Sequence, residues 1–578
     1  MASENKGDNM KLVNTVGFIA GFVMLVGLTQ ANATMKYAKV YKQECQGCHG
    51  SAHQGGVGAT LKPQILKKIN KQMLVNTILR GKAGTAMSAW GHMFSRNEAS
   101  GMVEWLIDWK SIYTPKLSLV KVKKTWKKLA DAKKLYYKYL TPADVKNVRD
   151  IQIGVERDAS LVDFYDGTSG KMLSRHKAGY AIHICQVNKR MPRYAYCISR
   201  SGRLTMFDLN APGEPALASV TVGTSSRGIA VSPNGKYVMT GNYSPGGAVL
   251  LNAHTLEPLK VYPTPSVINT TGQLGPSRVA MVIQTPYAPY FIFALKDGGH
   301  VYIVDYNKPG FPIIADVPNI GKILHDGFEN MGKDRGRFVY IASQMSNLMG
   351  VIDLKTLKLA AKIYTGPDSK PHPGQGASWY NKRYGQLNAT MSINEGDVVI
   401  WNMENEVVAS VKTAGGGLFV GTGDGTPYIW ADDVIGTALV YNRVYLINKQ
   451  TLKIDRIIKV GKHKGHLIDA HTGKILQTWN ATQYKNVMHK EFRSKLSKEF
   501  IMPYTAAHGS RLAHPVQPRL LHAEPMNFGK WTMISEWNKN GRIGIYNAKT
   551  GRFIKYIYNL TTPTFTYSIS HRIKVPGA

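Results

Sequence analysis

The sequence is poor in acidic residues. Asp and Glu number 37 against 73 Lys and Arg, which gives a formal charge of +36. Such a charge usually indicates nucleic acid or an anionic surface as a partner. Here the basic residues are scattered over the whole chain, and neither an RNA-binding nor a helix-turn-helix signature accompanies them. We therefore interpret the chain as a generally basic exported protein that does not bind nucleic acid.

Long apolar runs are missing after the N-terminus, so no membrane span is expected in the mature protein. The run from Val13 to Leu28 follows Lys11 and leads to Ala31-Asn32-Ala33, the pattern of an export signal with an A-x-A cleavage site. Its length of about 16 residues is short for a span. We predict a signal over residues 1–33, cleaved near Ala33; an uncleaved anchor is the alternative.

Cysteine is scarce, with four residues in the chain. Cys185 and Cys197 lie 12 positions apart, on two strands that we expect to be neighbours. In an exported protein they can form a disulfide or remain two buried thiols, and the sequence favours neither. Cys45 and Cys48 belong to the stretch CQGCH, which has no second pair of metal ligands at similar spacing. This absence excludes a zinc site, and a thioredoxin-type motif would not need the histidine.

The C-x-x-C-H motif predicts covalently attached haem c. The thiols of Cys45 and Cys48 add to the haem vinyl groups, and His49 ligates the iron. A sixth ligand is expected 40 to 60 residues further on, where Met87 lies in the Gly-containing stretch GTAMSAWG; His92 and Met93 are the alternatives. A helix-like stretch follows. Residues 34–113 therefore predict a small all-α class I cytochrome c domain that transfers single electrons.

Residues 114–149 form a basic connector, densest between Lys121 and Lys138. We interpret it as a solvated linker that is helical in part, with docking of an acidic partner as the alternative.

From residue 150 onward a hairpin pattern recurs. Alternating strands end in Asp or Asn, a tight turn follows and a second strand returns, beginning near residues 161, 203, 248, 300, 350, 398, 444 and 543. Such a period is typical of a β-propeller with about four strands per repeat. We predict a mostly β fold in which residues 150–578 form an eight-bladed propeller, with an insertion at about 461–519. The insertion contains one more hairpin-like piece, HLIDAHTGKILQTW, so the count of blades could be wrong by one.

Propellers bind ligands on their central axis, and a haem c domain in front of one indicates a second redox cofactor there. Pyrroloquinoline quinone is disfavoured, because its tryptophan-docking repeat should recur around the ring and occurs once here, and because adjacent cysteines are missing.

Three loops carry a more specific resemblance. The stretches GYAIH (179–183), LHDG (324–327) and PHPGQGA (371–377) occur in the order found in the cytochrome cd1 family, and TPTFTYSISH looks like its closing segment. The chain after the signal therefore resembles the periplasmic nitrite reductases and the dihydro-haem d1 dehydrogenases of that family. The resemblance implies non-covalent haem d1 with His183 as its iron ligand, His325 and His372 as the catalytic distal pair, and Arg227 and Arg278 as contacts of the macrocycle carboxylates.

The intact distal pair favours nitrite reduction to nitric oxide, with electrons that enter through haem c. Other stretches resemble the dehydrogenase instead. His522 lies where that paralogue has a histidine, and Gln375 replaces an arginine usual in the reductases. A diverged electron-transfer protein is the third hypothesis. The export signal, with the resemblance, predicts a periplasmic location. The resemblance implies a small soluble electron carrier, cytochrome c or cupredoxin, and makes a homodimer one possible assembly; the positive charge of the chain favours an acidic carrier.

Overall fold

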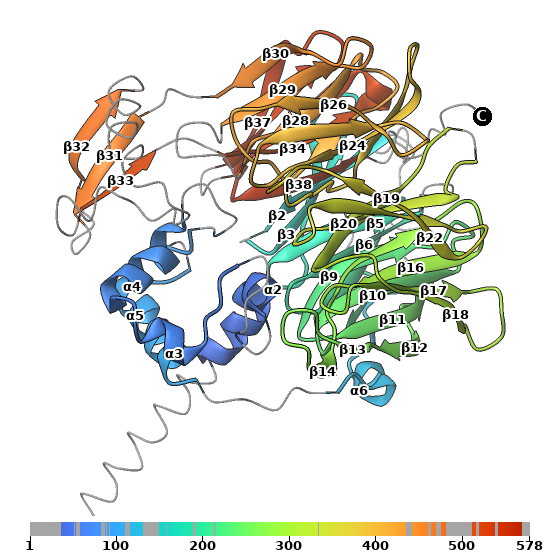
Figure 1. Ribbon diagram of the computed structural model, residues 1–578, viewed down its shortest axis with the longest axis horizontal. Helices are drawn as coiled ribbons and strands as arrows, with labels where there is room; N and C mark the ends of the chain where they lie inside the picture. Colours follow the sequence, from blue (N-terminus) through green and yellow to red (C-terminus); the bar gives the residue numbers. More distant parts are fainter. Residues whose placement is uncertain are drawn as a thin grey trace, which may run out of the picture.

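Figure 1 shows the computed structural model, in which a small helical part lies beside a large ring of β-sheets. The structure describes residues 36–50, 53, 58–82, 87, 89–91, 93–109, 116–130, 150–157, 159–188, 192–211, 213, 216–332, 334–434, 442–460, 464–469, 475–480, 511–515, 519–537 and 541–568. The predicted export signal lies outside these ranges. Within them, no helix is both long and apolar enough to cross a membrane.

The helical part is built around two packed helices. Its elements are the π-helical turn η1 (Tyr41–Cys45), α2 (Gln46–His49), α3 (Pro63–Leu66), α4 (Lys71–Arg80) and α5 (Arg96–Ile107). Ser95 begins α5 with a capping box, since its hydroxyl accepts from the Glu98 N–H and Glu98 returns a bond to the Ser95 N–H. The apolar residues of α5 recur at helical spacing and are buried, which directs one face towards α4.

The ring consists of eight blades of four strands each. Blades 1 to 4, from the innermost strand outward, are β38 (Pro563–Ser568), β2 (Ile151–Glu156), β3 (Leu161–Asp166), β4 (Met172–Lys177); β5 (Ile182–Val187), β6 (Tyr194–Ser199), β7 (Arg203–Asp208), β8 (Ala218–Thr221); β9 (Ser225–Val231), β10 (Tyr237–Ser244), β11 (Gly247–Asn252), β12 (Pro258–Pro263); and β15 (Val279–Gln284), β16 (Tyr290–Leu295), β17 (His300–Asp305), β18 (Ile313–Val317).

Blades 5 to 8 follow the same order. They are β19 (Leu324–Glu329), β20 (Phe338–Ser343), β21 (Leu348–Asp353), β22 (Lys358–Tyr364); β23 (Ala377–Asn381), β24 (Gly385–Met391), β25 (Asp397–Trp401), β26 (Val407–Lys412); β27 (Val420–Gly421), β28 (Tyr428–Asp432), β29 (Arg443–Asn448), β30 (Ile454–Lys459); and β34 (Arg519–Met526), β35 (Trp531–Trp537), β36 (Gly541–Asn547), β37 (Phe553–Leu560). A short hairpin, β13 (Pro265–Val267) with β14 (Leu274–Pro276), connects blades 3 and 4, and η3 (Asn527–Gly529) joins β34 to β35.

The prediction of an eight-bladed propeller behind a small helical cytochrome c domain is confirmed. The eight hairpins read from the sequence are the two outer strands of each blade, from β3–β4 to β36–β37. The ring closes because the C-terminal strand β38 pairs with β2, with Val155 opposite Phe565. Strands from distant parts of the chain thus share blade 1.

Apolar side chains pack between neighbouring blades all round the ring. Blades 4 and 5, for example, share a core that contains Ile292 and Ile341, and blades 8 and 1 share one that contains Met533 and Tyr165. Cys185 on β5 and Cys197 on β6 form a disulfide inside one of these cores, which resolves the pairing that the sequence left open.

The extra hairpin-like piece of the insertion does not add a blade. It forms β31 (Lys464–Asp469) and β32 (Ile475–Asn480), which join β33 (Arg511–Pro515) in a separate three-stranded sheet beside the helical part (Figure 1).

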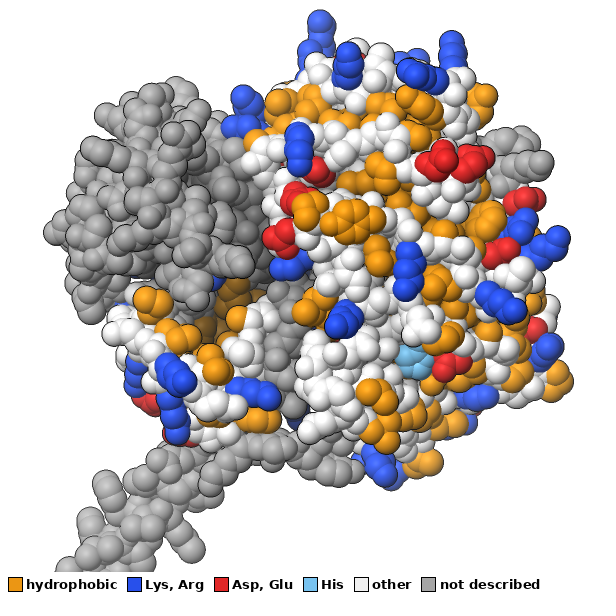
Figure 2. Space-filling model, viewed as in Figure 1, with side chains coloured by type: hydrophobic (Ala, Val, Ile, Leu, Met, Phe, Trp, Pro, Cys, Tyr) orange, Lys and Arg blue, Asp and Glu red, His pale blue; other side chains and the backbone are white. Residues whose placement is uncertain are grey.

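The connector, expected to be solvated, packs on the propeller over residues 116–130. Val122 of α6 (Leu119–Lys123) is buried in the core between blades 2 and 3, and β1 (Lys127–Lys128) pairs with β8. Apolar side chains hold this part of the connector on the propeller. The expectation of a solvated linker was based on its many lysines and did not take these apolar residues into account. Figure 2 shows the Lys and Arg side chains dispersed over the visible face of the propeller, without a continuous basic groove.

Candidate functional site

The helical part presents the haem c attachment motif on η1 and α2. Cys45 and Cys48 are not in a disulfide. The Nδ1 of His49 lies 2.7 Å from the backbone oxygen of Ala59, an acceptor, so Nδ1 carries the proton and Nε2 keeps its lone pair for the iron. Gly58 lies against this imidazole so closely that a Cβ there would be 2.8 Å from the ring. The motif is therefore arranged as haem c ligation requires.

Two described sulfur candidates for the second iron ligand pack against one apolar core of the helical part. Met87 and Met93 both contact the cluster that contains Trp90 and Phe94. The sulfur of Met93 also accepts a hydrogen bond of 3.2 Å from the hydroxyl of Tyr180 in the propeller. The third candidate, His92, lies outside the described residues. Met87 stays the predicted second ligand.

The innermost strands surround a cavity with about 1990 Å³ of empty space, its open mouth included. His183, Arg227, His325 and His372 all line it, so the structure brings four of the five propeller residues named from the sequence into one space. His183 belongs to blade 2 and His372 precedes blade 6, which places them on opposite sides of an eight-bladed ring. Cys48, which belongs to the haem c motif, also lines the cavity.

The candidate side chains occupy irregularities of the innermost strands. The ladder between β5 and β6 skips His183, that between β9 and β10 skips Arg227, and that between β19 and β20 skips His325 and Asp326. The ladder between β34 and β35 likewise skips His522. A bulge bends a strand and turns its extra residue away from the regular alternation. Each bulge thus frees one or two side chains from the packing between blades.

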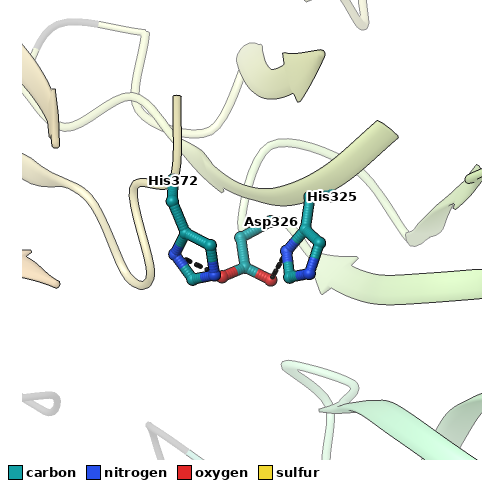
Figure 3. Close-up of side chains that lie close together, drawn as sticks. All are labelled: His325, Asp326 and His372. Carbon is teal, nitrogen blue, oxygen red and sulfur yellow. Dashed lines mark hydrogen bonds and ion pairs between the residues drawn. The ribbon is translucent and has the colours of Figure 1, made fainter. Parts of the chain in front are cut away.

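His325, Asp326 and His372 form a cluster on one wall of the cavity, shown in Figure 3. Nδ1 of His325 donates to Oδ1 of Asp326 at 2.9 Å. Nδ1 of His372 donates to the Leu418 oxygen at 2.8 Å and lies 3.3 Å from the other Asp326 oxygen. The ring centroids are 4.6 Å apart. Because every partner of the two Nδ1 atoms is an acceptor, each imidazole in its neutral form carries its proton on Nδ1 and has its lone pair on Nε2.

Electrostatics favour an ionised Asp326 carboxylate beside a neutral His325 imidazole. Burial, and then the charge of Lys296, lower the pKa of His325 to about 3. Burial works against the ionised form of Asp326, but the neighbouring His325 and His372 outweigh it and hold its pKa well below the usual range. Asp326 therefore holds His325 by a charge-assisted hydrogen bond, and its other oxygen lies 3.3 Å from Nδ1 of His372.

His183 is buried among cations. Burial, followed by the charges of Arg227, Arg200 and Arg157, lowers its pKa well below the ordinary value. The imidazole is therefore neutral at physiological pH, which is the state that ligates iron.

Three arginines line the cavity from neighbouring blades. Arg157, Arg200 and Arg227 belong to blades 1 to 3, where Glu44 pairs with the first two, while the carboxylates of Asp326 and Glu329 line the cavity from β19. Burial and the charge of Arg200 lower the pKa of Arg227 to about 9. Guanidiniums gathered on neighbouring blades are suited to bind the carboxylates of a ligand.

Arg278 lies behind this wall and does not line the cavity. Its guanidinium forms a buried ion pair with Asp297 and donates to the Gln46 oxygen at 2.9 Å. Arg157 and Arg200 line the cavity, so they are better placed than Arg278 for the carboxylate-binding role that was expected of it.

Gln375 joins the cavity to a second buried histidine. Its amide contacts Nε2 of His522 and lies 3.4 Å from a carboxylate oxygen of Glu524. The backbone N–H of Thr566 donates to His522 Nδ1 at 3.3 Å, and the amide nitrogen of Gln375 faces the other ring nitrogen, Nε2. The ring of Phe419 lies edge-on to His522, with centroids 4.9 Å apart, and itself lines the cavity.

Comparison with known proteins supports the same assignment. The family model described as Cytochrome D1 heme domain matches residues 146–572. The chain belongs to the cytochrome d1 haem-domain family. A second model, Cytochrome C oxidase, cbb3-type, subunit III, matches residues 32–106. The cofactors of this cytochrome cd1-type protein are haem c in the helical domain and haem d1 in the propeller, and it is a haem-dependent oxidoreductase.

Two relatives of different function are about equally similar. The nitrite reductase of Stutzerimonas stutzeri is 28% identical over 464 residues, 72% of this chain and 79% of the relative. The dihydro-heme d1 dehydrogenase of Pseudomonas aeruginosa is 29% identical over 472 residues, 80% of this chain and 91% of the relative. A solved dihydro-heme d1 dehydrogenase, NirN in complex with DHE, has a TM-score of 0.65 at 24% identity over 93% of this chain and 99% of that one. That likeness shows the fold.

Sequence reasoning missed several residues of this cytochrome cd1-type site. Asp326 is part of the LHDG stretch but was not given a role, and its adjacency to His325 was the available signal. Glu44 directly precedes Cys45, and no motif marks it. Arg157 and Arg200 join the cavity only because blades 1 and 2 bring them together.

Proposed function

We propose that this cytochrome cd1-type protein is a nitrite reductase that forms nitric oxide. The observation that carries the proposal is the pair of histidines, His325 and His372, 4.6 Å apart on one wall of the cavity and held by one carboxylate. Nitrite takes up one electron and two protons and leaves as nitric oxide and water. Bound haem d1 supplies the iron that takes nitrite and passes on the electron.

The distal histidines have the geometry of proton donors. Their Nδ1 protons are committed to Asp326 and to the Leu418 oxygen, so a proton taken up from water resides on Nε2. Two N–H groups then hold the nitrite oxygens by charge-assisted bonds and deliver the two protons that the leaving water requires. A low pKa makes His325 a strong donor once it is protonated.

His183 and the arginines hold the macrocycle in this scheme. We assign the iron ligand to Nε2 or Nδ1 of the neutral His183 and the carboxylate contacts to Arg157, Arg200 and Arg227, which supply the buried positive charge. On the electron side, we propose that the exported, periplasmic protein receives electrons through haem c, bound by His49 and Met87, from a small acidic carrier.

A second candidate is the dehydrogenase reaction, in which a propionate of dihydro-haem d1 loses two protons and two electrons to become an acrylate, and the electrons leave one at a time through haem c to an external carrier. The observation that favours it is the contact of Gln375 with His522 and Glu524, at the position where the reductases usually have arginine. These two buried titratable groups next to the cavity wall supply a base for such a proton.

One experiment separates the candidates. The protein with both haems is reduced and given nitrite, and nitric oxide is measured with an electrode; separately, the protein with haem c alone is given dihydro-haem d1 and its reduction of haem c is followed optically. Nitric oxide formation that is lost in His372→Ala and retained in His522→Ala supports the reductase. Haem c reduction by dihydro-haem d1 without nitrite turnover overturns it in favour of the dehydrogenase.

A further inference from the structure

The haem c attachment segment lies in the mouth of the propeller cavity and is held there by its backbone. Arg227 donates to the Gln43 oxygen and Arg278 to the Gln46 oxygen, each at 2.9 Å. Both guanidiniums also lie over the ring of Tyr243, 4.9 and 5.5 Å from its centroid. These contacts do not depend on the side-chain charges of the segment, so they keep the helical domain docked in any variant of those side chains.

One side chain of the segment enters the cavity. The Glu44 side chain is 1% exposed, and its Oε2 lies 3.2 Å from Nη2 of Arg157 and 2.9 Å from Nη1 of Arg200. The other carboxylate oxygen, Oε1, is buried without a hydrogen-bond partner among the described residues. Arg157 in addition lies over Trp90 of the helical domain and Trp537 of blade 8, 5.6 Å from each ring.

Two anions can therefore bind to Arg157 and Arg200: the Glu44 carboxylate and a carboxylate of haem d1. Both guanidiniums line the space that the macrocycle occupies, and both also hold Glu44. A guanidinium that also binds a macrocycle carboxylate shares its one positive charge between two anions, which weakens its bond to Glu44. The two anions also repel each other inside a cavity of low dielectric.

We propose that Glu44 is a positioning residue that couples the two haem sites: it competes with the haem d1 carboxylates for Arg157 and Arg200. Glu44 therefore lowers the affinity for haem d1, because haem d1 must draw the two guanidiniums away from it. When haem d1 binds, the negative charge of Glu44, one residue before Cys45, is no longer neutralised by these arginines. Because coupling between two sites is reciprocal, the redox state of haem c also changes the affinity for haem d1. The proposal rests on haem d1 binding and not on which reaction follows, so it and the proposed nitrite reductase activity fail separately.

The test compares Glu44→Gln with the wild type. Protein that contains haem c but not haem d1 is titrated with extracted haem d1, and the haem c midpoint potential is measured before and after. Glu44→Gln keeps the shape and removes the competing charge, so we expect haem d1 to bind about tenfold more tightly, equivalent to about 1.4 kcal/mol. In the wild type, haem d1 binding lowers the haem c potential, because Glu44 loses its cations; in Glu44→Gln this shift is much smaller.

The control is Glu104→Gln, which removes the same charge from an exposed residue of the helical domain that pairs with Lys71; it should leave the affinity and the shift unchanged. Arg200→Gln is the opposite perturbation and should weaken haem d1 binding. Equal haem d1 affinity and an equal potential shift in Glu44→Gln and the wild type overturn the proposal. A wild type that binds no haem d1 overturns it together with the cofactor assignment.

Discussion

Replacement of Asp326 by Asn tests the central feature of the distal site. The carboxylate accepts from Nδ1 of His325 and lies within reach of Nδ1 of His372. An amide has one oxygen and one NH2 group, so it can accept from one imidazole only, and the NH2 group opposes the N–H of the other. That second ring must leave its position or move its proton to Nε2.

The magnitude follows from the loss of one oriented proton donor. Such a loss costs about 10²-fold in kcat for nitrite, which corresponds to about 2.7 kcal/mol of transition-state stabilisation. The pH dependence should change as well. The negative charge of Asp326 raises the pKa of His325 against the effects of burial and Lys296, so Asn lowers that pKa further. Activity that needs the protonated imidazole is lost as pH rises through its pKa, so this alkaline limb should move to lower pH.

The assay is the pH–rate profile of nitric oxide formation by protein with both haems, together with the optical spectrum to confirm equal haem d1 content. Asp316→Asn is the matched control, because Asp316 also contacts a histidine, His300, but lies at the surface on β18. A kcat for Asp326→Asn within about twofold of the wild type, with an unmoved alkaline limb, refutes the role given to Asp326.

Three further predictions address the other parts of the molecule. His183→Ala should abolish the iron-ligand signature of haem d1 in the optical spectrum while the haem c bands stay unchanged; an unchanged haem d1 spectrum contradicts this ligand. Met87→Ala should lower the haem c midpoint potential strongly and Met93→Ala only slightly, and potentiometry that gives the reverse order moves the ligand to Met93. Ser95→Ala should reduce the free energy of unfolding of the helical domain by about 1 kcal/mol in chemical denaturation, and equal stability would show that the cap is dispensable.

The number of blades was predictable because each outer hairpin is a local feature. Each outer hairpin can be recognised from two alternating strands and a turn within about 15 residues of sequence. All eight hairpins recognised in this way are the two outer strands of a blade. The hairpin of the insertion has the same local pattern as the others, yet β31 and β32 pair with β33 and not with a blade. Whether a hairpin joins a blade depends on the strand that pairs with it, and that strand can be distant in the chain. A local sequence pattern therefore does not predict it.

The sequence by itself determined the haem c motif, the hairpin repeat and, through the three resembling loops, the histidines of the cavity. Each of these features is a short continuous stretch of sequence, in which residues that are close in the chain act together. Only the tertiary structure decided that bulges turn His183 and His325 inward, that Arg278 pairs with Asp297 behind the wall, and that Glu44 of the haem c segment meets Arg157 and Arg200. The physical reason is that the charge balance of a closed cavity is set by residues more than 100 positions apart, which come together only when the ring has closed.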